Sequence, residues 1–424
     1  MLAPSTPAAT QEPLLFRRTF SSLAVRNYRL YFFGQVVSQT GTWMQTVAQD
    51  WLVLGLTGRA LPVGITTALQ FLPVLLFGLW SGAIADRFEK RRILLLTQGT
   101  MAVLALVLGV LTVAGAVRLW MVYALAFLLG CTTAVDNPAR QSFMGELVGT
   151  DRIANAVSLN SASFNLARIA GPSFAGIVLA AWGIAPAFFL NAASFGAVLF
   201  ALAIMDRAQI SASAAAQRGS GGVAEGLRYV WATPGIRGPL LLVAAVATLG
   251  INFRVVLPVL ARFAFNGGPH EYGLLASLFA AGSFLGALGT ASFGLPSYRR
   301  MVAAAALFGA VALAAALAPT LAWEGAALVP LGAASITFLS TANSLIQIHT
   351  EPEKRGRVMA LYAVVFLGST PIGGGLVGWM SEVFGPRAGL WIAAASGLGG
   401  AALAAWRRRV GRARDGSDRS DGSV

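Results

Sequence analysis

The chain has 424 residues, of which 56% are hydrophobic and only 11% are charged, and its mean hydropathy is +0.69. A water-soluble surface needs a larger share of charged side chains, so this composition excludes a soluble globular protein and predicts a polytopic membrane protein. The net charge of +14 could also indicate nucleic-acid binding. The cations lie beside bilayer-length apolar segments, however, which is typical of topology signals and membrane-lipid contacts, so we expect no nucleic-acid partner.

Apolar runs long enough to cross the hydrocarbon core, about 20 residues each, recur from Leu30 to Trp406. They predict an all-α membrane protein with twelve transmembrane helices. The expected spans are 29–56, 61–85, 93–115, 119–141, 155–182, 186–206, 239–261, 272–293, 301–319, 323–346, 357–381 and 387–406.

The distribution of Lys and Arg predicts how these helices are oriented. Most of the 31 cationic residues fall in alternate loops, and cytoplasmic loops retain Lys and Arg during insertion. We therefore expect a multi-pass protein with both termini in the cytoplasm. The first 28 residues contain no short apolar core followed by a small-residue cleavage site, so no removable signal peptide is expected.

The apolar pattern is interrupted once, over residues 207–238, and this interruption divides the chain into halves. Residues 211–222 are rich in Ser, Ala and Gly and read as a flexible linker. Apolar residues at helical spacing then predict a short amphipathic helix: Val223, Leu227, Val230 and Trp231. The predicted domains are a cytoplasmic tail (1–28), a six-helix bundle (29–206), the linker (207–238), a second six-helix bundle (239–406) and a disordered cytoplasmic tail (407–424).

The two halves also share a register. A constant offset in residue number pairs Gly171 with Gly373 and Gly176 with Gly378. Parallel repeats of this kind pack around an axis along the membrane normal, with the substrate path between them. The repeat therefore favours a transporter of six plus six helices.

Several stretches carry recognisable motifs. One is the charged turn Gly82–Arg92 between the second and third spans, and another is Ala170–Gly176 in the fifth. The remaining motifs are Trp43-Met44-Gln45, Asp50–Leu54, Asp136–Gln141 and Gly356–Met359.

On these motifs the chain resembles the major facilitator superfamily, and more closely the bacterial drug-efflux branch that contains the enterobactin exporter. The resemblance implies two pseudo-symmetric bundles in a bacterial cell membrane. The chain departs from the family patterns at Glu89 and Ala175, where glycine is common. It also has Ala126 where many drug antiporters carry an arginine, so proton coupling through that arginine is not available here.

The charged turn predicts an inner-gate latch. An acid at a helix end, here Asp86, can accept hydrogen bonds from the free amides at the start of another helix. In the family this acid docks on the start of helix eleven, here near Gly356–Val358, and the arginines of the turn meet an acid of helix four, here Asp136. The alternative is that the arginines only set topology. The predicted latch residues are Asp86, Arg87, Arg91, Asp136 and Arg140.

Charges within the spans predict a substrate and proton cavity. Asp50, Arg168 and Arg254 each cost at least about 2.5 kcal/mol at mid-bilayer unless they face water or a partner. Asn165 precedes Arg168 by one turn, and Asn252 is close to Arg254 in sequence. The alternative is a structural ion pair plus one arginine that extends to the membrane surface. The predicted cavity residues are Asp50, Asn165, Arg168, Asn252 and Arg254.

Gly171, Pro172 and Gly176 predict a helix-packing hinge in the fifth span. Glycine permits close backbone approach, and proline removes an intrahelical hydrogen bond. The expected neighbour is helix seven or eight.

These features predict a secondary transporter that exports a drug, siderophore or secondary metabolite by alternating access, with protons as the coupling ion. The alternatives are an uncoupled or uptake transporter, and a non-transporting membrane sensor or assembly protein. One cysteine and two histidines build no nucleophilic or metal cluster. The chain also carries no phosphate-binding loop. We therefore predict no enzyme activity, metal or cofactor, and make no prediction of oligomeric state.

Overall fold

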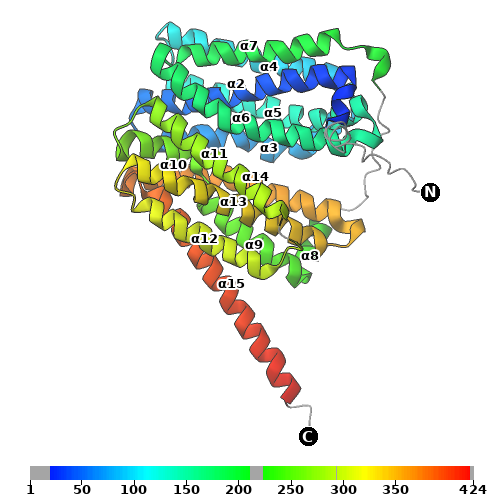
Figure 1. The fold of residues 1–424 in the computed structure, drawn as a ribbon, viewed down its shortest axis with the longest axis vertical. Helices are drawn as coiled ribbons and strands as arrows, with labels where there is room; N and C mark the ends of the chain where they lie inside the picture. Colours follow the sequence, from blue (N-terminus) through cyan, green and yellow to red (C-terminus); the bar gives the residue numbers. More distant parts are fainter. Residues whose placement is uncertain (1–19, 211–222, 293, 421–424) are drawn as a thin grey trace, which may run out of the picture.

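The computed structural model describes residues 20–210, 223–292 and 294–420, without the side chains of 79, 83, 85, 86, 223–226 and 407–420. These residues form helices that gather into two halves, side by side (Figure 1). The N-terminal half contains η1 (Ser21–Ala24), α2 (Arg26–Thr57), α3 (Leu61–Arg87), α4 (Lys90–Val113), α5 (Leu119–Val148), η2 (Thr150–Arg152), α6 (Ile153–Trp182), α7 (Ala185–Ile204) and η3 (Arg207–Gln209).

The second half follows residues 211–222, which are outside the described part, as is residue 293. Its elements are α8 (Val223–Ala232), α9 (Pro234–Leu249), α10 (Phe253–Val259), η4 (Leu260–Ala264), α11 (Pro269–Ser292), α12 (Tyr298–Ala316), α13 (Leu321–Ile348), η5 (Pro352–Lys354), α14 (Arg355–Phe384) and α15 (Ala388–Ser420).

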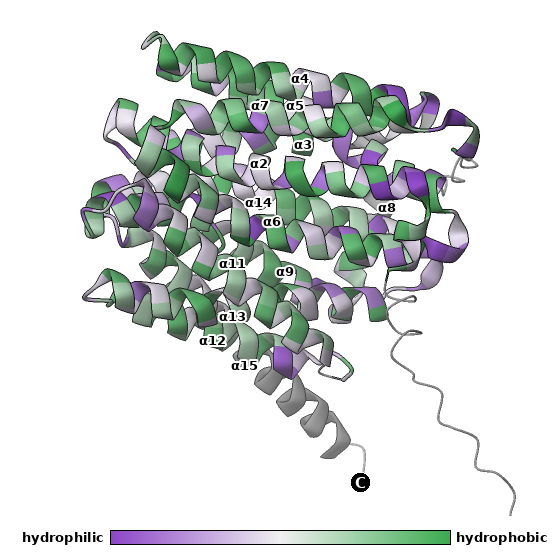
Figure 2. Ribbon diagram, turned by 45° about the horizontal axis from the view of Figure 1, so that its top comes forward, coloured by the Kyte–Doolittle hydropathy of each residue, from purple (hydrophilic) through white to green (hydrophobic). Residues whose placement is uncertain are grey.

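The predicted set of membrane-spanning helices is confirmed. Within the described residues, 11 helical segments are long and apolar enough to cross a membrane, and α9, α10 and η4 together make one of them. Helix α2 is the twelfth by length, with 32 residues. Its hydropathy is lower because it carries buried glutamines at Gln35, Gln39, Gln45 and Gln49. Figure 2 shows apolar residues running along the helices of both halves.

The internal repeat is visible in the helix boundaries. Helices α6 and α14 each have 30 residues and an internal proline, Pro172 and Pro371. Each is followed by a glycine with positive φ, 83° at Gly183 and 96° at Gly385, a conformation that side chains disfavour. The offset that pairs the glycines in sequence therefore also pairs these two helices.

The seventh span is broken in the middle. Helix α9 ends at Leu249, and α10 begins at Phe253 after Asn252. Asn252 is buried, and its amide donates to the carbonyl of Thr248 at 2.8 Å. Irregular backbone at membrane depth is tolerated when it is buried in protein. The break places Arg254 in the first turn of a new helix rather than in the interior of a long one.

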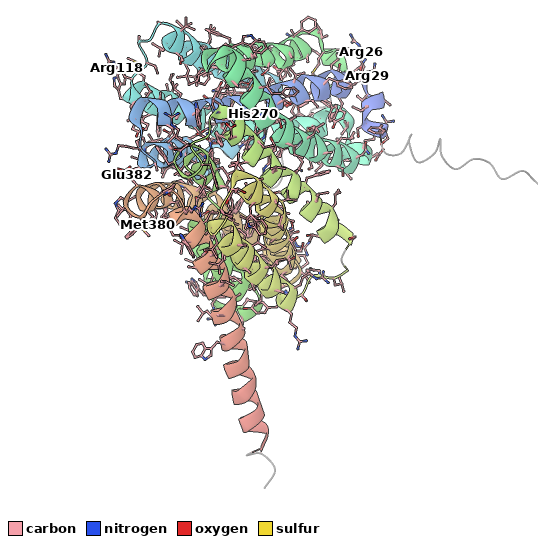
Figure 3. All side chains as sticks on the ribbon, turned by 60° about the vertical axis from the view of Figure 1, so that its left-hand side comes forward. Arg26, Arg29, Arg118, His270, Met380 and Glu382 are labelled. Atoms are coloured by element: carbon pink, nitrogen blue, oxygen red, sulfur yellow. The ribbon has the colours of Figure 1, made fainter. Side chains whose placement is uncertain are left out.

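The two ends of the bundle differ in charge. We call the end that carries Arg26, Arg29 and the α3–α4 connection the basic end, and the opposite end the far end. Figure 3 shows Arg26 and Arg29 at one end and Arg118 and Glu382 at the other.

Helix α15 differs from the predicted disordered tail. It continues to Ser420 and projects beyond the other helices (Figure 1). Residues 407–414 include five arginines and no proline, and a helix that is already formed propagates through arginine readily, in spite of the single glycine at 411.

Helix α8 occupies the segment predicted as a short amphipathic helix. Val230 is buried, whereas Leu227 and Trp231 are exposed. Its placement on the inner membrane surface stays a prediction.

Candidate functional site between the two halves

A buried carboxylate joins the two halves. Asp50, in α2, has no exposed surface. Its Oδ2 accepts a hydrogen bond from the hydroxyl of Tyr272 in α11 at 3.0 Å and lies 3.4 Å from Nε of Arg254 in α10. The predicted residues Asp50 and Arg254 are thus brought together, and Tyr272 completes a group that we call the Asp50 triad.

The surroundings of the triad are aromatic and well packed. Trp51 stacks on Tyr272 with 6.3 Å between ring centroids, and the guanidinium of Arg262 lies 5.5 Å from the Trp51 ring. The second carboxylate oxygen of Asp50 has no hydrogen-bond partner among the described residues. A buried charge that is only partly satisfied is sensitive to its protonation state and to the position of its counter-ion.

Arg168 lies between the halves without a carboxylate. Its guanidinium carbon is 6.0 Å from the ring centroid of Trp43 in α2 and 5.8 Å from that of Phe279 in α11. Among the described residues it makes no hydrogen bond or ion pair. Asn165 makes no hydrogen bond to it, and its amide donates instead to the carbonyl of Ser161 at 2.8 Å. Asn252 likewise bonds within its own span.

The predicted hinge residues pack against two different helices. A Cβ on Gly171 would lie 2.4 Å from Cβ of Trp43 in α2, so α6 and α2 are in close contact there. Gly176 faces the backbone of His270 in α11, and a Cβ on Gly273 would lie 2.4 Å from the carbonyl oxygen of Pro172. The neighbour was expected to be helix seven or eight; the contacts are with helix eight, α11, and also with helix one, α2.

Hydroxyl groups connect the same pair of helices. The hydroxyls of Ser173 in α6 and Ser277 in α11 lie 2.7 Å apart, and Ser277 donates to the carbonyl of Ile169 at 2.9 Å. These contacts lie on the far-end side of Arg168. On its other side, toward the basic end, Phe164 is 45% exposed.

At the far end the two halves are joined by Glu382, an acid that was not among the predicted site residues. Glu382, near the end of α14, forms an ion pair with Arg59 and accepts from the backbone N–H of Leu61 at 3.2 Å. Gly378 packs on Ala60, which brings the two helix ends together. Glu382 gave no sequence signal, because it lies at a helix end where carboxylates are common.

The predicted latch residues do not form one cluster. Asp136 is fully buried, pairs with Arg140 on its own helix, and accepts from Thr97 at 2.7 Å and Gln98 at 2.9 Å. All of these residues belong to the N-terminal half.

The predicted contact between Arg91 and Asp136 is not formed. Arg91 is buried and its Nε donates to the carbonyl of Leu202 at 2.8 Å. The last four carbonyls of a helix lack helical partners, and Leu202 lies in the last turn of α7, so Arg91 satisfies one of them. Arg87 has no ion-pair partner among the described residues, and the side chain of Asp86 lies outside them.

Helices α3 and α14 approach closely only toward the far end. A Cβ on Gly64 would lie 2.2 Å from the carbonyl oxygen of Gly374. Toward the basic end, a Cβ on Gly78, Gly82 or Gly356 would meet nothing within 4 Å. The contacts between the halves described above run from mid-bundle to the far end, whereas these three glycines make no close contact toward the basic end.

Comparison with known proteins identifies the family of this chain. A model of the family described as transmembrane secretion effector matches residues 17–420. The chain is 26% identical to a staphyloferrin A transporter of Staphylococcus aureus, over 84% of this chain and 90% of that protein. It is 27% identical to the multidrug efflux pump Tap of Mycolicibacterium fortuitum, over 85% of this chain and 90% of that protein.

A solved structure shows the same fold. The inward-facing, unoccupied structure of a bacterial homologue of the human lysosomal transporter Spinster matches with a TM-score of 0.68 and 19% identity, over 85% of this chain and 82% of that one. With twelve membrane helices in two halves and a family match along almost its entire length, the chain belongs to the transmembrane secretion effector family of the major facilitator superfamily.

Proposed function

We propose that this protein exports a small organic molecule from the bacterial cytoplasm by alternating access, in exchange for protons. The observation that carries the proposal is the Asp50 triad, in which one buried carboxylate of the N-terminal half is held by Arg254 and Tyr272 of the other half. Relatives named as a multidrug efflux pump and a siderophore transporter support a drug or siderophore as the exported molecule.

The orientation follows from the charge of the two ends. The basic end is cytoplasmic because Lys and Arg accumulate in cytoplasmic loops, and the far end is external. The protein is then open to the cytoplasm and closed to the outside. This is the state in which an exporter accepts its substrate.

Protonation of Asp50 couples the two states. The charged carboxylate attracts Arg254 across the interface and holds the far end closed. When the far end opens, Asp50 faces external water and takes up a proton, and the neutral carboxyl is less costly to bury again as the far end closes. Arg254 then favours loss of that proton toward the cytoplasm, so a proton moves inward for each substrate molecule that moves outward. The proton and the substrate thereby control the same interface.

The latch residues act in the opposite state. When the far end opens, the basic ends of α3 and α14 must meet. Gly78, Gly82 and Gly356 leave room for that approach, as Gly64 and Gly374 do at the far end. Asp86 then accepts from the amides at the start of α14, and Arg87 pairs within the same contact.

Gradient-driven transport in proteoliposomes tests the proposal with Asp50→Asn. The substitution removes the charge from a buried ion pair, so we expect accumulation of a substrate dye, drug or siderophore driven by a pH gradient to fall roughly tenfold or more. Asp151→Asn, at an exposed carboxylate of the basic end, is the matched control and should transport like the wild type.

Retention of gradient-driven transport by Asp50→Asn contradicts the coupling role. Wild-type flux that is independent of the gradient indicates facilitation, and inward accumulation indicates uptake. A folded, correctly inserted wild-type protein that moves no compound of the panel favours a sensor or assembly protein.

A further inference from the structure

Arg168 is the intramembrane cation that the Asp50 triad does not explain. Arg140 pairs with Asp136 and Arg254 with Asp50, whereas Arg168 has neither a carboxylate nor a hydrogen-bond partner among the described residues. Arginine remains charged in proteins, so a buried guanidinium requires a counter-charge or a polarisable surface.

Two aromatic rings, one from each half, take the place of the missing carboxylate. Trp43 belongs to α2 and Phe279 to α11, and both centroids lie within about 6 Å of the guanidinium carbon. The rings are held by further aromatic contacts, from Phe164 to Trp43 at 5.8 Å and from Phe253 to Phe279 at 4.3 Å. Ring contacts do not consume the guanidinium N–H donors, which remain available to an acceptor.

The position of Arg168 favours an acceptor that arrives from the basic end. On the far-end side the path is occupied by the contact of Ser277 with Ile169 and Ser173. On the basic-end side Phe164 is 45% exposed and the side chain of Asn165 is within one turn. A molecule that enters between the halves therefore meets aromatic surface first and the guanidinium at the closed end.

We propose that Arg168 binds an acidic group of the transported molecule, so that the substrate class is an organic carboxylate with an aromatic or apolar body. This inference rests on the proposed transport function and adds the chemistry of its substrate. A carboxylate can accept two parallel N–H bonds from the planar guanidinium, whereas the aromatic rings accommodate the remainder of the molecule. Trp43 and Phe279 come from opposite halves, so a molecule bound between the two rings contacts both halves of the protein.

Binding to purified full-length protein in lipid nanodiscs tests the inference. Naphthalene-2-carboxylate is the acidic probe, and 2-naphthamide and 2-naphthylmethylammonium are its neutral and cationic counterparts. We expect the carboxylate to bind at least about tenfold more tightly than the amide, the size of a charge-assisted hydrogen bond. Arg168→Gln should abolish this preference and Arg168→Lys should retain part of it. Arg118→Gln, at an exposed loop position, should leave it unchanged.

Equal affinity of the wild type for all three probes overturns the inference, as does an undiminished carboxylate preference in Arg168→Gln. Empty nanodiscs correct for partition of the probes into lipid. If Arg168→Gln does not fold, the carboxylate preference of Arg168→Lys is compared with that of the wild type instead. This binding experiment and the transport experiment with Asp50→Asn can give different answers, so the substrate class and the proton coupling are tested separately. Carboxylate binding through Arg168, combined with transport that ignores the pH gradient, supports the substrate class and contradicts proton exchange.

Discussion

Glu382 joins the two halves at the far end through contacts of two kinds. Its carboxylate pairs with Arg59 and also accepts from the N–H of Leu61 in the first turn of α3. A negative charge at a helix N-terminus is favourable, because the first N–H groups of a helix have no helical partners. One side chain of α14 thus serves both as an ion-pair partner and as a cap for α3.

Glu382→Gln should therefore open the far end more often. Exposed ion pairs and helix-end charges are each weak, so we expect the population of the open state to rise roughly two- to fivefold. The measurement is double electron–electron resonance between spin labels at Arg118→Cys and Trp323→Cys, in a Cys131→Ser background. The distance between these labels, one on each half at the far end, increases when the far end opens.

The control is Glu353→Gln, at an exposed position of the basic end, which should leave the distance distribution unchanged. High salt should reduce the difference between wild type and Glu382→Gln, because exposed charges are screened. Identical distributions in the two proteins at low salt would show that the pair does not hold the far end.

At the scale of helices, the α6–α11 contact depends on glycine. A Cβ on Gly273 would lie 2.4 Å from the carbonyl oxygen of Pro172 and 3.0 Å from the backbone of Gly176. Backbone atoms cannot rotate away as a flexible side chain can. Any side chain at this position must therefore move the two helices apart.

Gly273→Ala should destabilise the closed far end by about 1–3 kcal/mol, the usual cost of overpacking. In detergent this should lower the temperature of thermal unfolding by several degrees. Gly289→Ala is a matched control on the same helix, because a Cβ there meets nothing within 4 Å. Equal unfolding temperatures for the two variants would refute the close contact.

The helices themselves could be predicted from sequence because hydropathy and charge are local properties. Even α2, whose buried glutamines lower its hydropathy, was within reach through its length. The expected continuous span 239–261 was wrong in one respect, since the chain breaks between Leu249 and Phe253. Gly250, Asn252 and Pro258 were the available signals for that break.

The candidate site was only partly predictable. The cost of intramembrane charge identified Asp50, Arg168 and Arg254 without their partners. Tyr272 and Glu382 depend on how two halves far apart in sequence align, and no local pattern encodes that alignment. The partner of Arg91 is likewise a free carbonyl, which any residue type can supply.

For the whole molecule, the proposed alternating access requires closure at each end in turn. The described conformation is closed at the far end, and the latch motif around Asp86 would close the other. Each of the two helices has glycines toward both ends, Gly64 and Gly82 in α3 and Gly356 and Gly374 in α14, which gives room for a close approach at either end.

Asp86→Asn should therefore slow transport while membrane insertion remains normal, because an amide retains the shape but loses the charge that favours a helix N-terminus. We expect a loss of roughly threefold to tenfold in rate, measured as substrate flux per inserted protein in proteoliposomes. Glu351→Gln, on the surface of the same end, controls for a general change in charge. An unaltered rate would remove the latch.

The repeat relates the α3–α14 seam to the α6–α11 seam, yet among the described residues only the first carries an ion pair. At the second, Gly273 and Gly176 pack backbone against backbone. We therefore expect ionic strength to weaken the α3–α14 seam more than the α6–α11 seam. Both seams have close glycine contacts, so the ion pair of Arg59 with Glu382 is what distinguishes them. If the far end opens, we expect it to begin along α3–α14 when salt weakens that pair, with α6–α11 separating later.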